Sequence, residues 1–297
     1  MMQKLVLLFL GIGLMASAQT KYLNAVYTDI EKTTHTYNKI GKDSLQLDFY
    51  KARTSEGIVP LIVFVHGGGF SGGQRDAEGT VEFATRMAKR GYAVASMSYQ
   101  LLAKKNGFGC NVEATDKINI FDTAADDIVE AVRFILKNDD LFPIDENKVI
   151  LSGTSAGAEA ALHLVYVKEN NKLPNRFQFA GVMSFAGAVI TTNNITDETA
   201  IPTLLFHGTN DNLVPYHISA HHFCNPSDKG YLMLYGSRPI ADKLKGLGKS
   251  YFLFSILGGT HSWANLPMNR SISEISDFLF HDVINGSKRQ TERTIGL

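Results

Sequence analysis

Three segments of the sequence hold residue types that can together perform acyl transfer. The first is residues 153–157, G-T-S-A-G, a G-x-S-x-G motif centred on Ser155. Small residues around a serine permit a sharp turn that exposes the hydroxyl group, as a nucleophile requires. The alternative is a tight turn in which the serine only caps a helix. Because a strand is predicted before the motif and a helix after it, we favour the nucleophile.

A serine nucleophile needs a base, and the base needs a group that orients it. In one chain order of such sites, the acid and then the histidine follow the serine. Asp211 and His261 each lie in a loop just after a predicted strand. Ligand sites of open parallel sheets lie beyond the carboxyl ends of the strands. We therefore predict His261 as the base and Asp211 as its orienter, with Asp197, in a nearby polar loop, as the alternative acid.

The third segment is H-G-G-G-F at 66–70, which ends an apolar strand. Glycine loses more conformational entropy on folding than other residues, so three in a row indicate that a ligand approaches the peptide groups. A phosphate-binding loop would continue to a Gly-Lys-Ser/Thr sequence, which does not follow here. A dinucleotide pattern can be placed on Gly67, Gly69 and Gly72, but no helix is predicted to begin there. We interpret the glycines as exposing amides to an oxyanion.

Apolar patterns predict the elements that must position these segments. The unbroken apolar run at 59–65 is typical of a strand buried on both faces. The residues before it predict an antiparallel hairpin, 28–40 and 44–50. Further strands are predicted at 92–99, 148–151, 179–185, 203–206 and 251–257, and helices at 81–89, 121–138, 156–167 and 273–283. This alternation predicts an α/β fold whose mostly parallel sheet has helices on both faces and antiparallel strands at its N-terminal edge.

No linker divides the chain, so we predict one domain over residues 19–297. The segment 101–117 is expected to be irregular, and 222–248 to form a small helical insertion over one end of the sheet. The charged stretch 288–293 is expected to be a frayed, solvated end.

The first 18 residues resemble an export signal. Lys4 precedes a short apolar run, 5–15, and the small residues A-S-A follow at 16–18. The run is short for a bilayer span, which disfavours the alternative of a retained anchor. We therefore predict a signal peptide at 1–18, a mature chain from near Gln19 with no membrane span, and a secreted or periplasmic protein. In an oxidising compartment Cys110 and Cys224 can form a disulfide; the alternative is two unpaired, buried cysteines.

The balance of charge argues against one class of partner. The 297 residues include 29 basic and 29 acidic side chains, and this balance disfavours nucleic acid as a partner. No metal-ligand spacing or cofactor motif is found, and we expect no cofactor.

The H-G-G-G-F loop, the G-x-S-A-G turn and the ordered Asp211 and His261 resemble the α/β-hydrolase family, above all secreted carboxylesterases. The resemblance covers nearly the whole mature chain. It implies Ser155 as nucleophile, His261 as base and Asp211 as orienter. It also implies an oxyanion hole made by the amides of Gly68, Gly69 and Ala156.

The sequence departs from the lipases that share the H-G-G-G-F loop. Many of them have an acidic residue where this chain has Thr154, and a glycine where it has Ala158. The chain is more similar to secreted esterases that remove acetyl or feruloyl groups from plant polysaccharides. The resemblance thus implies a small-molecule or polysaccharide ester as substrate. The alternatives are a serine peptidase of the same fold and a catalytically inactive binding module.

Overall fold

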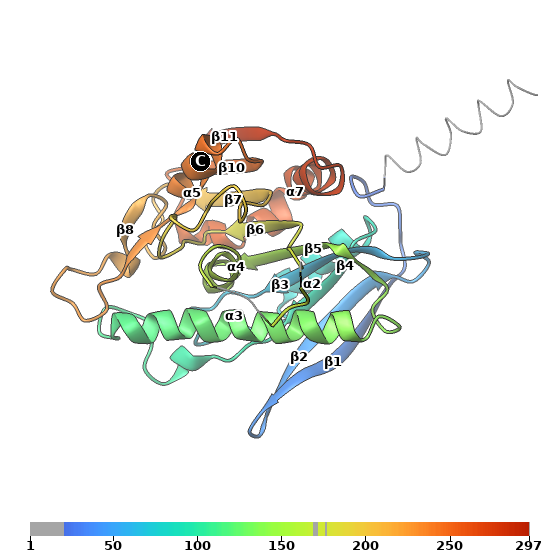
Figure 1. Ribbon diagram of the computed structural model, residues 1–297, viewed down its shortest axis with the longest axis horizontal. Coiled ribbons are helices and arrows are strands. Elements are labelled where there is room, and N and C mark those ends of the chain that lie inside the picture. Colours follow the sequence, from blue (N-terminus) through green and yellow to red (C-terminus); the bar gives the residue numbers. More distant parts are fainter. Residues whose placement is uncertain (1–20, 169–171, 176, 297) are drawn as a thin grey trace, which may run out of the picture.

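The fold is built on a mixed sheet of nine strands in the order β1-β2-β4-β3-β5-β6-β7-β10-β11 (Figure 1). The computed structural model describes residues 21–168, 172–175 and 177–296, so the predicted signal peptide lies outside the described residues. The strands are β1 (Ile30–Ile40), β2 (Asp43–Ala52), β3 (Val59–Val65), β4 (Ala93–Met97), β5 (Ile144–Thr154), β6 (Gly181–Phe185), β7 (Thr203–Gly208), β10 (Tyr251–Leu257) and β11 (Gln290–Gly296). A separate ribbon pairs β8 (Ile218–Ala220) with β9 (Met233–Tyr235).

The strands from β4 to β11 pair in parallel, whereas β1 pairs antiparallel with β2, and β2 with β4. Helices cover both faces of this sheet. They are α2 (Glu78–Ala88), α3 (Ala114–Lys137), α4 (Ala156–Tyr166), α5 (Ser237–Gly246), α6 (Pro267–Arg270) and α7 (Ile272–Phe278). This architecture confirms the predicted α/β fold class.

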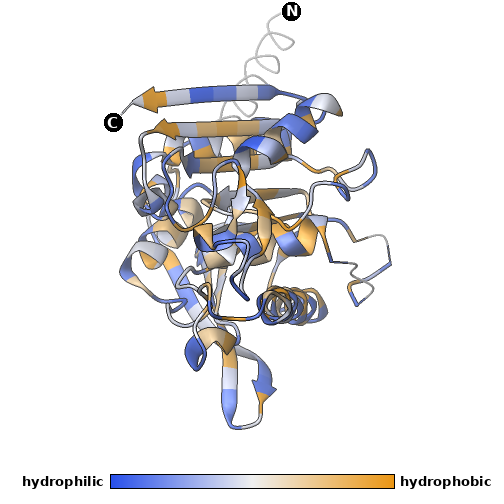
Figure 2. Cartoon of the chain, turned by 90° about the vertical axis from the view of Figure 1, so that its left-hand side faces the viewer, coloured by the Kyte–Doolittle hydropathy of each residue, from blue (hydrophilic) through white to orange (hydrophobic). Residues whose placement is uncertain are grey.

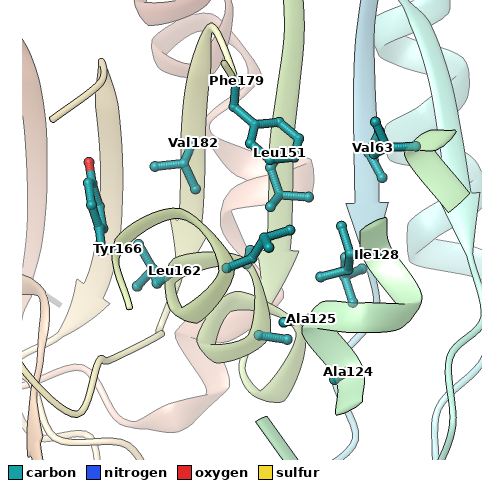
Figure 3. Close-up of a cluster of buried hydrophobic side chains, with 14 of the residues drawn as sticks. Val63, Ala124, Ala125, Ile128, Leu151, Leu162, Tyr166, Phe179 and Val182 are labelled. Carbon is teal, nitrogen blue, oxygen red and sulfur yellow. The ribbon is translucent and has the colours of Figure 1, made fainter. Parts of the chain in front are cut away.

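Two apolar cores lie on the opposite faces of the sheet. Alternate residues of a strand point to opposite faces, and β3 accordingly places Val63 in one core and Phe64 in the other. Helices α3, α4 and α5 pack on the first face, where Ile128 and Leu162 lie near Val63 and Leu151 (Figure 3). Helices α2, α6 and α7 pack on the second face. Burial on both sides explains the unbroken apolar run of β3.

The expectation of a frayed C-terminal end was wrong, because residues 290–296 form the parallel edge strand β11 beside β10. This strand is largely hydrophilic (Figure 2), so its sequence lacks the apolar run of a buried strand. Its charges are paired across the surface: Glu292 accepts hydrogen bonds from Arg238 at 2.9 Å and Lys245 at 3.1 Å. The Arg238 guanidinium lowers the pKa of Glu292 to about 2. Charged side chains on an edge strand also discourage pairing with other chains.

Two loop regions are more regular than expected. The segment 101–117 contains a 3-10 turn, Leu102–Lys104, and the first turn of α3. Polar residues occupy that turn, and Lys117 is buried, where it donates to the Gly230 carbonyl oxygen at 2.7 Å. In the segment 222–248, α5 packs Ile240 and Leu244 into the sheet's own core, so the expected insertion is confined to the β8–β9 region. Among the described residues, no helix combines the length and apolarity needed to span a bilayer.

Candidate active site

Ser155 lies at the sharp turn between β5 and α4, with a φ of 50° and a ψ of −123°. This backbone is strained for a residue with a side chain and persists only where the surrounding structure enforces it. Gly157 packs so closely on the Val65 carbonyl oxygen that a Cβ would overlap it, and Gly153 packs equally closely on Gly157. The two motif glycines thus let α4 begin against β3. The Ser155 hydroxyl group is thereby held at the carboxyl end of the sheet.

A continuous hydrogen-bonded chain links the three residues predicted as nucleophile, base and orienter. His261 Nε2 lies 2.8 Å from Ser155 Oγ, and His261 Nδ1 lies 2.7 Å from Asp211 Oδ2. Because the ionised carboxylate accepts from Nδ1–H, the Nε2 atom is free to accept the proton of the serine hydroxyl group. The three side chains follow β5, β7 and β10. Because these strands are parallel, all three side chains lie at the carboxyl end of the sheet.

The Asp211 carboxylate is buried and held by several donors. Its Oδ1 accepts from the amides of Leu213 and Val214, at 2.9 and 3.0 Å. Its Oδ2 lies 2.7 Å from His261 and 3.3 Å from His207 Nε2. Burial alone would raise the pKa of Asp211, but the hydrogen bonds from the two histidines outweigh burial and lower that pKa. The carboxylate is therefore ionised at neutral pH.

The alternative acid, Asp197, lies away from this chain. Its side chain is 75% exposed and forms an ion pair with Lys249 at 3.2 Å. The structure therefore brings Asp211, and not Asp197, to His261.

Several contacts fix the start of the glycine loop. The Gly67 amide donates to Thr154 Oγ1 at 2.9 Å, and Nδ1 of His66 donates to the Gly67 carbonyl oxygen at 2.8 Å. Tyr99 donates its hydroxyl to the His66 carbonyl oxygen at 3.0 Å and stacks on the imidazole. Burial lowers the pKa of His66, which keeps the ring neutral. Thr154, one of the departures from the lipase pattern, thus ties the loop to the nucleophile turn.

The loop and the first turn of α4 present amides near Ser155. Gly68 has a φ of 122°, and a Cβ there would overlap the Gly72 carbonyl oxygen. Within the described part of the chain, the amides of Gly68, Gly69 and Ala156 donate to no protein group. All three residues line the same cavity as Ser155. Free amides in this position can hold the negative charge of a tetrahedral intermediate.

We expect Gly69→Ala to lower kcat about 100- to 1,000-fold, the effect of losing one oxyanion donor. Gly69 has a φ of 59°, whereas the nearest atom to an added Cβ is 3.9 Å away. Space is available, so the substitution acts by moving the backbone and its amide. Gly72→Ala is the matched control, because Gly72 lies in the same loop at ordinary φ. Equal steady-state kcat values for folded Gly69→Ala and wild type would contradict this role.

The cavity at Ser155 has a volume of about 500 Å³. One part of its wall is formed by the glycine loop, the nucleophile turn and His261. The rest is formed by residues that sequence reasoning did not assign to the site: Gln74, Ala77, Thr80, Phe108, Glu159, Leu213, Val214, His221, His222 and Asn265. Among them, Glu159 is a carboxylate in the first turn of α4. Its spacing of four residues from Ser155 places it one turn further along the same helix face.

A disulfide joins Cys110 to Cys224, whose Cα atoms lie 5.3 Å apart. It connects the loop that contains Phe108 to the turn that contains His221 and His222, all of which line the cavity. Cys110, Cys224 and Asp228 are also the one group of potential metal ligands found close together in the described residues. Both sulfurs are used in the disulfide, so this group does not offer the thiolates that a metal would need.

Removing the disulfide should destabilise the protein. The two cysteines are 114 residues apart, and loop-closure entropy predicts a loss of about 5 kcal/mol in the free energy of unfolding for so long a loop. Denaturant unfolding of the double variant Cys110→Ser/Cys224→Ser measures this loss. Thiol counting in denaturant without reductant provides the check, since two free thiols per wild-type chain would contradict the bond.

Comparison with known families gives one match, which covers the glycine loop and the nucleophile turn. The BD-FAE family model matches residues 47–197, slightly more than half of the 297 residues. The matched region includes the glycine loop and Ser155, whereas Asp211 and His261 follow it.

Two curated relatives are similar over part of their length. Gut esterase 1 from Caenorhabditis briggsae is 28% identical over 165 residues, and gut esterase 1 from Caenorhabditis elegans is 28% identical over 170 residues. Each alignment covers 56% of this chain and 28% of the relative. The chain therefore corresponds to little more than a quarter of either esterase.

Solved structures share the fold over most of the chain. Esterase 2 from Thermogutta terrifontis with bound propionate gives a TM-score of 0.60 at 20% identity, and covers 84% of this chain and 93% of that one. The same esterase phosphoramylated by tabun gives 0.61 at 20% identity, with coverages of 84% and 94%. At this identity the likeness establishes the α/β-hydrolase fold.

Proposed function

Because the chain belongs to the BD-FAE family, we propose that it is a serine hydrolase that cleaves carboxylic esters through an acyl-enzyme. The observation that supports this most directly is the chain of hydrogen bonds from Ser155 through His261 to Asp211. It lies beside amides that donate to no protein group among the described residues. This combination serves acyl transfer, because it supplies a nucleophile, a base and donors for an oxyanion.

In the first half-reaction, Ser155 Oγ attacks the ester carbonyl carbon while His261 Nε2 takes the hydroxyl proton. The carbonyl π bond becomes an oxyanion, which the amides of Gly68, Gly69 and Ala156 stabilise. Collapse of this intermediate breaks the bond to the alcohol, and the imidazolium of His261 protonates the departing oxygen. Asp211 stays ionised throughout and stabilises that imidazolium.

In the second half-reaction, His261 takes a proton from water as the water oxygen attacks the acyl carbon. A second oxyanion forms in the same place and collapses, which releases the acid and returns the proton to Ser155 Oγ. No proton or electron has to be supplied from outside this cycle.

For the substrate, we propose small aryl esters and the acyl esters of plant polysaccharides. Support comes from the resemblance of the glycine loop and serine turn to secreted esterases. Names of similar proteins add to it, since two are called gut esterases and a third is described with propionate bound.

Two measurements on the purified protein test this function. A fluorophosphonate probe should label Ser155, as the solved neighbour is described in a phosphoramylated form. A panel of p-nitrophenyl acetate, acetylated xylan, feruloyl esters and peptide p-nitroanilides should show ester turnover well above amide turnover. Absence of labelling would favour an inactive binding module, and faster amide cleavage would favour a peptidase.

We also propose that the protein is exported and cleaved near Gln19. The support is the charged start, the apolar run and the A-S-A sequence at 16–18, together with a disulfide that an oxidising compartment permits. N-terminal sequencing of the protein from its native host checks this, and an intact Met1 would contradict it.

A further inference from the structure

Two buried polar side chains lie in the wall of the Ser155 cavity, outside the hydrogen-bonded chain described above. Glu159 follows Ser155 by four residues on α4 and is 2% exposed. His221 lies in the short turn before Cys224 and has no exposed surface. Both line the cavity together with Ser155 and His261. We call them the Glu159–His221 pair.

The pair has unused hydrogen-bonding capacity. Glu159 Oε1 and both ring nitrogens of His221 have no hydrogen-bond partner among the described residues. Glu159 Oε1 lies 3.7 Å from His221 Nε2, which is longer than a hydrogen bond between these atoms. Buried polar atoms without partners are rare in proteins and call for an explanation, of which an absent ligand is one. An oxygen atom between them, on the cavity side, can lie about 2.8 Å from both.

The surroundings of the pair select a neutral group. Burial raises the pKa of Glu159 well above its usual value, and burial lowers the pKa of His221 well below its own. Both side chains are therefore shifted toward their uncharged forms. The buried Lys117 lowers the pKa of His221 further and disfavours a bound cation, and the burial of the site away from water also disfavours a bound anion. Phe108 packs edge-on against the His221 ring and closes this part of the wall.

We propose that the Glu159–His221 pair binds a hydroxyl group carried by the substrate close to its ester bond. A hydroxyl group has both a proton to donate and lone pairs that accept, so it can pair with Glu159 Oε1 and His221 Nε2 at once. This inference rests on the proposed ester hydrolysis and makes it more specific. The preferred substrates are hydroxylated esters, with the hydroxyl group on either the alcohol or the acyl part.

Matched ester pairs, in which a methyl group replaces the hydroxyl, test the proposal. On the alcohol side, 2-hydroxyethyl acetate is compared with propyl acetate. On the acyl side, ethyl 3-hydroxybutyrate is compared with ethyl 3-methylbutyrate. We expect kcat/KM, measured by acid release, to favour the hydroxylated ester of one pair about 10- to 100-fold, because the methyl analogue leaves buried polar atoms unpaired. The pair that shows the preference identifies the side of the ester that the site reads.

Substitution of either residue should remove the preference. Glu159→Met keeps the length of the side chain without its oxygens, and His221→Phe keeps the ring that packs on Phe108 without its nitrogens. In both variants, the ratio of kcat/KM between the paired esters should fall to near one. Asp127→Leu is the matched control: Asp127 is a carboxylate that is also 2% exposed, but it is hydrogen-bonded to Gln100 and lies outside the cavity lining. That variant should keep the wild-type ratio, with folding checked by thermal unfolding.

The ratio separates this proposal from the function on which it rests. If wild type hydrolyses both members of each pair equally well, the hydroxyl site is refuted and the ester hydrolase stands. A wild-type preference that survives in both Glu159→Met and His221→Phe would refute the site as well. If wild type cleaves no ester and takes no fluorophosphonate label, both proposals fail together.

Discussion

Ser155→Ala is expected to lower kcat for ester hydrolysis about a million-fold, the loss seen when a serine nucleophile is removed. Without the hydroxyl group no acyl-enzyme can form, and the strained turn cannot place another nucleophile beside His261. The residual rate would come from the oxyanion amides and substrate binding alone. Stopped assays with p-nitrophenyl acetate, together with loss of fluorophosphonate labelling, measure the effect.

Ser152→Ala is the control for this experiment. Ser152 lies in β5, three residues before Ser155, and its buried hydroxyl group has no hydrogen-bond partner among the described residues. Its removal should therefore leave both stability and turnover close to wild type. If cleanly purified Ser155→Ala retains more than a few per cent of wild-type activity, Ser155 is not the nucleophile.

Asp211→Asn should slow turnover about ten-thousand-fold while the protein stays folded. The amide oxygen of asparagine can still accept from the amides of Leu213 and Val214, which hold the loop. Its NH₂ group would face His261 Nδ1, where it donates a hydrogen bond instead of accepting one. The imidazole would then carry its proton on Nε2, the atom that must accept the proton of Ser155.

The control for this second prediction is Asp197→Asn, which removes the charge of the exposed alternative acid. It should leave kcat unchanged, since Asp197 pairs with Lys249 on the surface. A slow Asp197→Asn and a normal Asp211→Asn would show that the wrong acid has been assigned. Measuring kcat of both variants with one aryl ester decides which aspartate orients His261.

Local patterns in the sequence were enough to predict the elements around the nucleophile. The strand 59–65 agrees with β3, and the strand 251–257 agrees with β10. Each is a short apolar run bounded by turn residues, and its period does not depend on distant parts of the chain. The turn at Ser155 was readable for the same reason, since the glycines that it requires are its immediate neighbours.

Elements stabilised by distant contacts could not be predicted in this way. The strand β11 is polar, and its place is set by backbone pairing with β10 and by the ion pairs of Glu292. The first turn of α3 is also polar, and its inward-facing Lys117 is satisfied by a carbonyl oxygen 113 residues away in the sequence. Neither element shows an apolar period, which is the signal that sequence analysis uses.

The sequence alone thus determined which reactive groups the chain contains: a serine on a sharp turn, a glycine loop, and a late aspartate and histidine at strand ends. The tertiary structure decided which side chains meet. It brought Asp211 and not Asp197 to His261, and it placed Glu159 and His221 together in the cavity wall with a gap between them. Residue type and local period specify what a segment can do and what shape it takes. Which residues contact each other across 50 or more positions of the sequence depends on how the sheet and its loops pack, and no local pattern encodes that packing.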